Sequence, residues 1–261
     1  MGTVIVLLIG ACVGVVVGAL GAGGGILSVP ILVYLLGQSP HAAASESLVI
    51  VIVTALVSLP SRAYCGQVRW REGVVVGLLS TVGAVGGSWL NALVEGEALM
   101  VAFSALLVVV AVVMAWRTRR AEHPSREQVD QMIEQQPPRS SWRLLVVVAA
   151  TATGLLTGFF GVGGGFAVVP MLTLVLGLDI RRASATSLVV MVIAATAALA
   201  QRMMGPVEID WALTLAFTAA SAAGGAAGGL LSQRARASTL SYLFVALLLA
   251  VALLTAARAL W

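Results

Sequence analysis

The stretch that decides the fold occurs twice: GALGAGGGILSVPILVYLLGQSPHAAASESLV at residues 18–49, and GFFGVGGGFAVVPMLTLVLGLDIRRASATSLV at residues 158–189. Laid over each other at an offset of 140, the two copies are identical at 14 of 32 positions. Six glycines, a proline and a serine are among the matches, and apolar composition alone does not align such residues. The chain is therefore an internal duplication.

Composition places both copies in a membrane. Of the 261 residues, 60% are hydrophobic and only 10% are charged, whereas a soluble domain carries about 25% charged residues. A helix needs about 20 apolar residues to cross a hydrocarbon core about 30 Å thick, and the chain offers a series of apolar runs near that length. A water-soluble enzyme is excluded, and an all-α polytopic membrane protein is predicted.

Ten apolar segments fall into two sets of five, separated by a polar stretch at 117–143. That stretch holds arginines, acids, prolines and glutamines, cannot bury itself, and is predicted to be an aqueous linker. The predicted domains are a first membrane repeat at 1–116 and a second at 144–261. The segments are 3–22, 24–36, 41–60, 73–93, 98–116, 144–161, 164–176, 183–201, 211–231 and 238–258.

An odd number of spans in each half inverts the second copy relative to the first. Five spans per half place 13 of the 15 arginines on one face and leave only Arg202 and Arg258 on the other; if the two short segments are re-entrant, the split is 11 to 4. The inverted arrangement is favoured. By the positive-inside rule the linker is cytoplasmic and both termini face outward.

The short segments 24–36 and 164–176 each follow a glycine cluster. Glycine lets backbone amides approach a ligand, and an interrupted helix has unpaired N–H groups at its positive end. The two starts are predicted to form an anion cradle near the midplane. Glycines can instead serve close helix packing, which is favoured for the doublets Gly86-Gly87, Gly224-Gly225 and Gly228-Gly229. No Lys-Ser/Thr follows the clusters, so a nucleotide loop is excluded.

Hydroxyl groups begin the third segment of each half, within Ser45-Glu46-Ser47 and Ala185-Thr186-Ser187. They can donate to an anion or bond to their own backbone, and both alternatives stay open. Glu46 is costly at that depth unless paired or protonated. It either lies in headgroup water or carries a proton.

Five further side chains are given structural interpretations. His41 is predicted to be a solvated interfacial residue, and Arg62 and Arg202 are predicted to snorkel to the headgroups. Cys12 and Cys65 lack the spacing of a zinc or redox motif, and burial is expected for both.

These residues resemble the sulfite exporter TauE/SafE family of bacterial membrane transporters. The resemblance rests on the duplicated G-x-G-G-G before a proline-containing short helix, on A-x-x-x-S-L at 43–48 and 183–188, and on G-x-V at 66 and 205. It implies transport of sulfite, sulfonates or related anions across the bacterial inner membrane. Family members often have Thr-Ser in both copies, whereas the first copy here has Glu46-Ser47.

The sequence therefore favours a secondary transporter of a small sulfur-containing anion that works by alternating access. A passive anion channel and a membrane subunit of a larger permease are the alternatives. An enzyme is not expected, because neither HExxH nor paired membrane aspartates occur. No cofactor, metal or nucleic acid is expected, and the partners are the anion, the bilayer and a coupling proton through Glu46. The predicted anion-binding residues are Gly23, Gly24, Gly25, Ser47, Gly163, Gly164, Gly165, Thr186 and Ser187.

Overall fold

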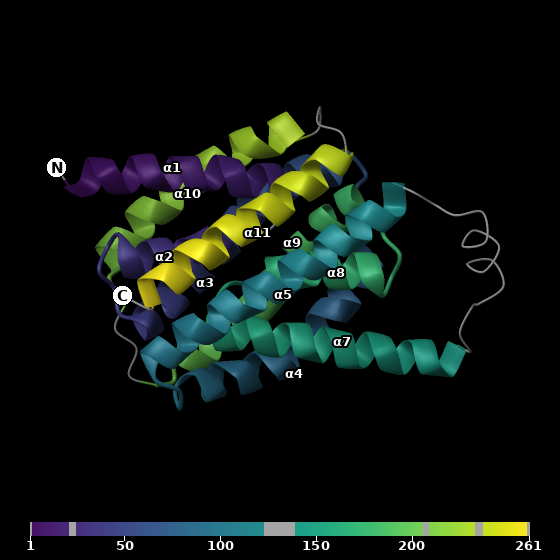
Figure 1. The fold of residues 1–261 in the computed structure, drawn as a ribbon, viewed down its shortest axis with the longest axis horizontal. Coiled ribbons are helices and arrows are strands. Elements are labelled where there is room, and N and C mark those ends of the chain that lie inside the picture. The colour runs from purple at the N-terminus through teal and green to yellow at the C-terminus, as the bar shows by residue number, and fades with distance from the viewer. Residues whose placement is uncertain (1, 21–24, 123–138, 206–208, 233–236, 260–261) are drawn as a thin grey trace.

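A computed structural model describes residues 2–20, 25–122, 139–205, 209–232 and 237–259, and these ranges contain helices and no strand. The order of elements confirms two sets of five helices, each with one short second member (Figure 1). The first set is α1 (Gly2–Leu20), α2 (Gly25–Tyr34), α3 (Pro40–Tyr64), α4 (Trp70–Asn91) and α5 (Gly96–Glu122). The second set is α7 (Arg139–Phe160), α8 (Gly165–Leu174), α9 (Ile180–Arg202), α10 (Trp211–Ser232) and α11 (Ala237–Ala259).

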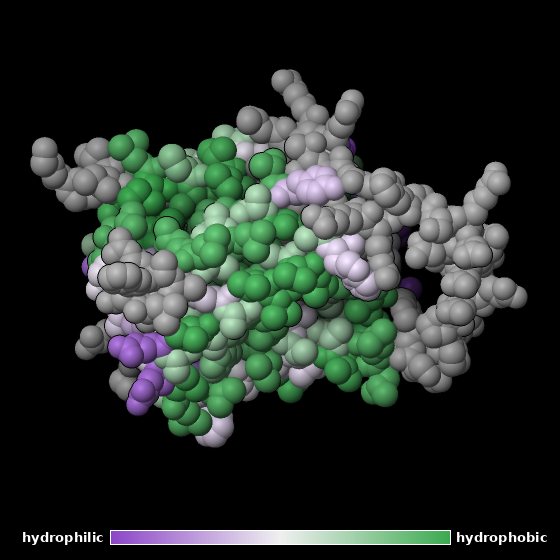
Figure 2. Space-filling model, viewed as in Figure 1, coloured by the Kyte–Doolittle hydropathy of each residue, from purple (hydrophilic) through white to green (hydrophobic). Residues whose placement is uncertain are grey.

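The helices are apolar enough for a bilayer. Among the described residues, α3, α4, α9 and the Gly96–Trp116 part of α5 are long and apolar enough to cross one. Apolar side chains cover much of the face seen in Figure 2, where water would disfavour them but lipid does not. Cys12 and Cys65 are exposed, so the expectation that they are buried was wrong. The chain is an all-helical, multi-pass membrane protein.

Helices of one half pack mainly on helices of the other. The first helix of each half lies against the fourth helix of the opposite half, so that α1 packs on α10 and α7 on α4. Small residues allow this approach: a Cβ on Gly87 would overlap the backbone of Leu155, and one on Gly224 would overlap that of Ala11. Close packing is thus confirmed for these two doublets, although Gly86 itself faces open space.

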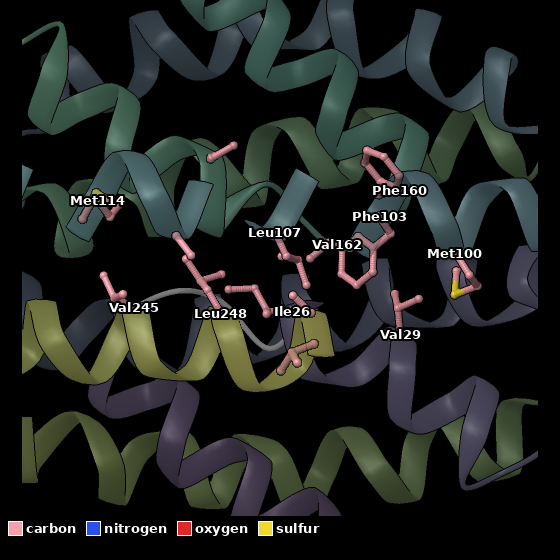
Figure 3. Close-up of a cluster of buried hydrophobic side chains, with 14 of the residues drawn as sticks. Ile26, Val29, Met100, Phe103, Leu107, Met114, Phe160, Val162, Val245 and Leu248 are labelled. Carbon is pink, nitrogen blue, oxygen red and sulfur yellow. The ribbon is translucent and has the colours of Figure 1, made fainter. Parts of the chain in front are cut away.

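The third helices, α3 and α9, contact each other at the centre, and each holds the short helix of its own half, α2 on α3 and α8 on α9. The fifth helices, α5 and α11, run side by side over this centre (Figure 1). Figure 3 shows Phe103 and Leu107 of α5 and Leu248 of α11 packed near Ile26 and Val162. This apolar cluster closes one flank of the short-helix region.

The polar stretch predicted as a linker is partly helical. Helix α5 continues beyond residue 117 to Glu122, and α7 begins at Arg139 rather than at residue 144. Arginine, glutamate and alanine favour a helix without needing burial, so a helix can extend past its apolar portion. Residues 123–138 lie outside the described part of the chain.

Candidate functional site

The turn between α7 and α8, residues 161–164, is called the glycine turn. Gly161, Gly163 and Gly164 have φ angles of 69°, 66° and 68°, in the left-handed region that favours glycine. Gly164 is the N-cap residue of α8. These glycines therefore allow the chain to turn tightly between a full helix and a short one.

The start of α2 meets the glycine turn. Gly25 lies so close to Val162 that a Cβ on Gly25 would overlap the Val162 backbone, and α2 and α8 are in contact. The two short helices thus begin next to each other, although they are 140 residues apart in sequence. Gly23 and Gly24 lie outside the described residues.

At the glycine turn, the carbonyl groups of Gly161 and Gly164 accept hydrogen bonds, whereas two of the amides have no acceptor among the described residues. The Gly164 carbonyl accepts from the N–H of Val168 at 2.7 Å, and the Gly161 carbonyl accepts from the Ser47 hydroxyl. Within the described ranges, the N–H groups of Gly163 and Gly164 have no acceptor. Since the positive end of the α8 dipole lies at the same place, the turn is suited to a negatively charged ligand.

The predicted hydroxyls of Ser47, Thr186 and Ser187 are all buried, and two of them join different elements. Thr186 Oγ1 accepts from the backbone N–H of Arg69 at 3.1 Å, which joins α9 to the residue before α4. Ser187 donates to the carbonyl of Ser184 at 2.9 Å. The own-backbone alternative is therefore realised at Ser187, whereas Ser47 bonds to the glycine turn of the other half.

Glu46 is fully buried. Its Oε1 accepts from the backbone N–H of Asp210 at 3.1 Å, at the start of α10. Its Oε2 is buried and has no hydrogen-bond partner in the described part of the chain. The alternative that Glu46 lies in headgroup water was therefore wrong, because the helix packing places its position inside the protein.

Two buried arginines were missed as site residues. Arg62 Nη2 donates to the Gly18 carbonyl and Arg202 Nη2 to the Gly158 carbonyl, each at 2.7 Å. The side chains are only 4% and 7% exposed, so the prediction that they snorkel to headgroups was wrong. The last carbonyls of a helix that ends inside the protein need donors, and the guanidinium groups supply them. The signal was available, since both arginines and both glycines repeat at the 140-residue offset.

A cavity of about 570 Å³ opens between the start of α3 and the ends of α4 and α9. We call it the Arg202 cavity, and its polar wall consists of Ser39, His41, Ser45, Ser88, Asn91, Gln201 and Arg202. His41 is partly buried, with Nδ1 3.2 Å from Asn91 Oδ1. It is thus part of a polar pocket rather than a purely solvated interfacial residue.

Comparison with known proteins gives one family. The family model "Sulfite exporter TauE/SafE" matches residues 6–255. A "Probable membrane transporter protein" of Xylella fastidiosa (strain Temecula1) is 38% identical over 164 residues, which are 62% of this chain and 59% of that protein. The "Probable membrane transporter protein YunE" of Bacillus subtilis is 26% identical over 228 residues, 83% of each chain. The match therefore spans about three fifths of the Xylella protein, and no solved structure matches.

Proposed function

Because this chain belongs to the sulfite exporter TauE/SafE family, we propose that it is a secondary transporter of a small sulfur oxyanion, sulfite or an organosulfonate. The membrane is the bacterial inner membrane, and the mechanism is alternating access between the two halves. The energy comes from an ion gradient or from the gradient of the substrate itself, because no nucleotide loop is found in the sequence.

One observation carries the proposal: consecutive left-handed glycines leave amides without a described acceptor at a point buried between the halves. Buried amides must find an acceptor in a membrane, and an oxyanion offers several oxygens while avoiding a buried ion pair. The hydroxyls of Ser47, Thr186 and Ser187 each bond to the backbone in this structure. When the helices move, these bonds break and the hydroxyls become further donors to the anion. The proposed binding residues are Gly23, Gly24, Gly25, Ser47, Gly163, Gly164, Gly165, Thr186 and Ser187.

Alternating access is supported by the repetition of contacts between the halves. The pairs α1–α10 and α7–α4, which join the halves, correspond under the 140-residue offset, and the pairs α2–α3 and α8–α9 correspond within each half. Two halves that pack by the same rules can exchange conformations with similar energy. We place the linker in the cytoplasm and both termini outside, with the second repeat inverted relative to the first.

Coupling to a proton is assigned to Glu46. This carboxylate is buried, has one oxygen without a described partner, and contacts the N–H of Asp210 where α10 begins. Gain or loss of a proton changes the charge at a contact between the halves, which is what a coupled transporter needs.

The test is the flux of labelled sulfite into proteoliposomes that contain the purified chain alone. Replacing Thr186 with Val removes the hydroxyl but keeps the shape, and flux is expected to fall about tenfold, the equivalent of about 1.4 kcal/mol. Thr186→Ser is expected to restore most of it. The control is Thr173→Val, because Thr173 is equally buried but bonds to Pro170 of its own helix.

The outcomes separate the candidates. Saturable flux with counterflow supports a transporter, whereas steady single-channel currents indicate a passive channel. Absence of flux from the purified chain, with flux in the presence of a further subunit, indicates a permease component. Equal flux in Thr186→Val and Thr173→Val contradicts the proposed site.

A further inference from the structure

We propose that the Arg202 cavity is a separate binding site for a small oxyanion, in which the anion is held before it reaches the glycine turn. This inference rests on the proposed function, because it takes the transported anion as the ligand. It adds a site and a charged residue that the glycine cradle does not contain. Arg202, Ser45, His41 and Asn91 form the site.

The charge of Arg202 is not neutralised by any described partner. The side chain is 7% exposed, and its two hydrogen bonds run to neutral acceptors, from Nη1 to Ser45 Oγ at 3.1 Å and from Nη2 to the Gly158 carbonyl at 2.7 Å. No carboxylate of the described residues lies within ion-pair distance of it. A buried cation without a counter-ion favours an anionic ligand strongly.

The guanidinium group also has unused donors. It carries five N–H groups in a fixed plane, of which two are engaged as described. Its Nε is buried and has no hydrogen-bond partner in the described structure. A guanidinium that keeps donors free beside a cavity matches the geometry of an oxyanion, which accepts two parallel hydrogen bonds.

The neighbouring polar groups are held in position by bonds to the backbone. Ser45 donates to the His41 carbonyl at 3.0 Å while it accepts from Arg202. Asn91 Nδ2 donates to the Phe159 carbonyl at 2.7 Å, and its Oδ1 lies next to the His41 ring. These bonds fix the wall of the cavity, so that an anion meets a preorganised polar surface.

Two residues of the cavity wall bond to the last residues of α7, just before the glycine turn. Arg202 bonds to Gly158 near the end of α7, and Ser47 bonds to Gly161 directly after that helix. Ser45 and Ser47 belong to the same turn of α3. The Arg202 cavity and the glycine turn are therefore only a few residues apart on α3 and on α7.

The site is formed by residues of both halves, and it has no counterpart at the position that the duplication relates to it. At the 140-residue offset Ser45 is replaced by Ala185 and His41 by Arg181, so Arg62 lacks the hydroxyl that accompanies Arg202. In the predicted topology Arg202 also lies on the outer face, opposite most of the arginines. The positive-inside rule accounts for arginines on the cytoplasmic face and therefore does not account for Arg202. The cavity volume of about 570 Å³ is in the range of small-molecule pockets, which span about 300–1,000 Å³.

The experiment is a sulfite titration of the purified full chain in detergent, against sodium chloride at equal ionic strength. Trp89 lines the cavity, so the fluorescence that Trp89→Phe removes reports on this site. Ala42 lines the same cavity in the first turn of α3. Ala42→Asp adds a negative charge that the start of a helix tolerates, and Ala42→Asn is its neutral control of equal size.

A saturating Trp89 signal is expected, with a dissociation constant raised about tenfold in Ala42→Asp and in Arg202→Gln, and changed less than about twofold in Ala42→Asn. Equal affinities of the two Ala42 variants overturn the site, whether or not Arg202→Gln folds. If the chain carries sulfite but Trp89 does not respond, the cavity proposal fails and the transport proposal stands. If Trp89 responds with this charge dependence but no anion is transported, the transport proposal fails and the cavity site stands.

Discussion

The two halves share a hydrogen bond from a buried arginine to a backbone carbonyl, but they differ in the residues around that arginine. Arg62 and Arg202 each donate to a helix-end carbonyl, of Gly18 and Gly158, at the same distance of 2.7 Å. Among the described residues a hydroxyl accepts from Arg202 but none accepts from Arg62, and the position of Ser45 is alanine in the other half. We infer that the shared bonds stabilise the fold and that the residues that differ determine the proposed anion binding.

Glu46 and Thr186 are a second pair of equivalent positions that share a hydrogen bond but differ in their side chains. Each accepts a backbone N–H, from Asp210 and from Arg69, at 3.1 Å, immediately before the fourth helix of the other half. The contact is the same, although one acceptor is a carboxylate and the other a hydroxyl. A position that keeps its bond but changes its charge is where the halves can differ in function.

The largest expected effect tests the shared bond between arginine and glycine. Arg62→Leu and Arg202→Leu each leave a buried carbonyl without its donor, so each is expected to lower the free energy of unfolding by about 2–3 kcal/mol. Thermal unfolding in detergent measures the loss, with the exposed Arg71→Leu as the control. A loss at only one of the two sites would break the structural equivalence of the ends.

The helix pattern was predictable from the sequence, but the arginine contacts were not. Apolar runs, prolines and duplicated glycines define α2 and α8 nearly to the residue, because these features act locally. Arg62 and Arg202 lie at the ends of α3 and α9, where snorkelling is also reasonable. Their burial depends on α1 and α7 ending beside them, which is tertiary information. The repeat itself carried the missing signal, because arginine and glycine recur together at one offset.

The next largest expected effect concerns Glu46, which accepts a hydrogen bond from the N–H of Asp210 just before α10. Glu46→Gln keeps an oxygen for the Asp210 N–H, so stability is expected to change little, but the side chain can no longer exchange a proton. If Glu46 couples transport, flux in the parent protein changes up to about tenfold per pH unit over part of its range, and the variant loses this dependence. Sulfite flux measured across a pH series checks this.

The matched control is Glu72→Gln, since Glu72 is a partly exposed carboxylate beside Arg69. It is expected to retain the pH profile of the parent protein. If the pH profile of flux is unchanged in Glu46→Gln, Glu46 does not carry the coupling proton. It is then only a hydrogen-bond acceptor for the N–H before α10, as Thr186 is for the N–H before α4.

The smallest expected effect comes from replacing Ser45, the residue beside Arg202 that is alanine at the equivalent position of the other half. Ser45→Ala copies the other half, and because it removes one neutral partner while Arg202 keeps its charge, sulfite affinity at the Arg202 cavity is expected to fall only about threefold, equivalent to about 0.7 kcal/mol. The reciprocal Ala185→Ser gives Arg62 a hydroxyl neighbour and is expected to leave the Trp89 signal unchanged. If Ser45→Ala has no effect on affinity, the charge of Arg202 alone defines the site, and the asymmetry between the halves must lie in His41 and Asn91.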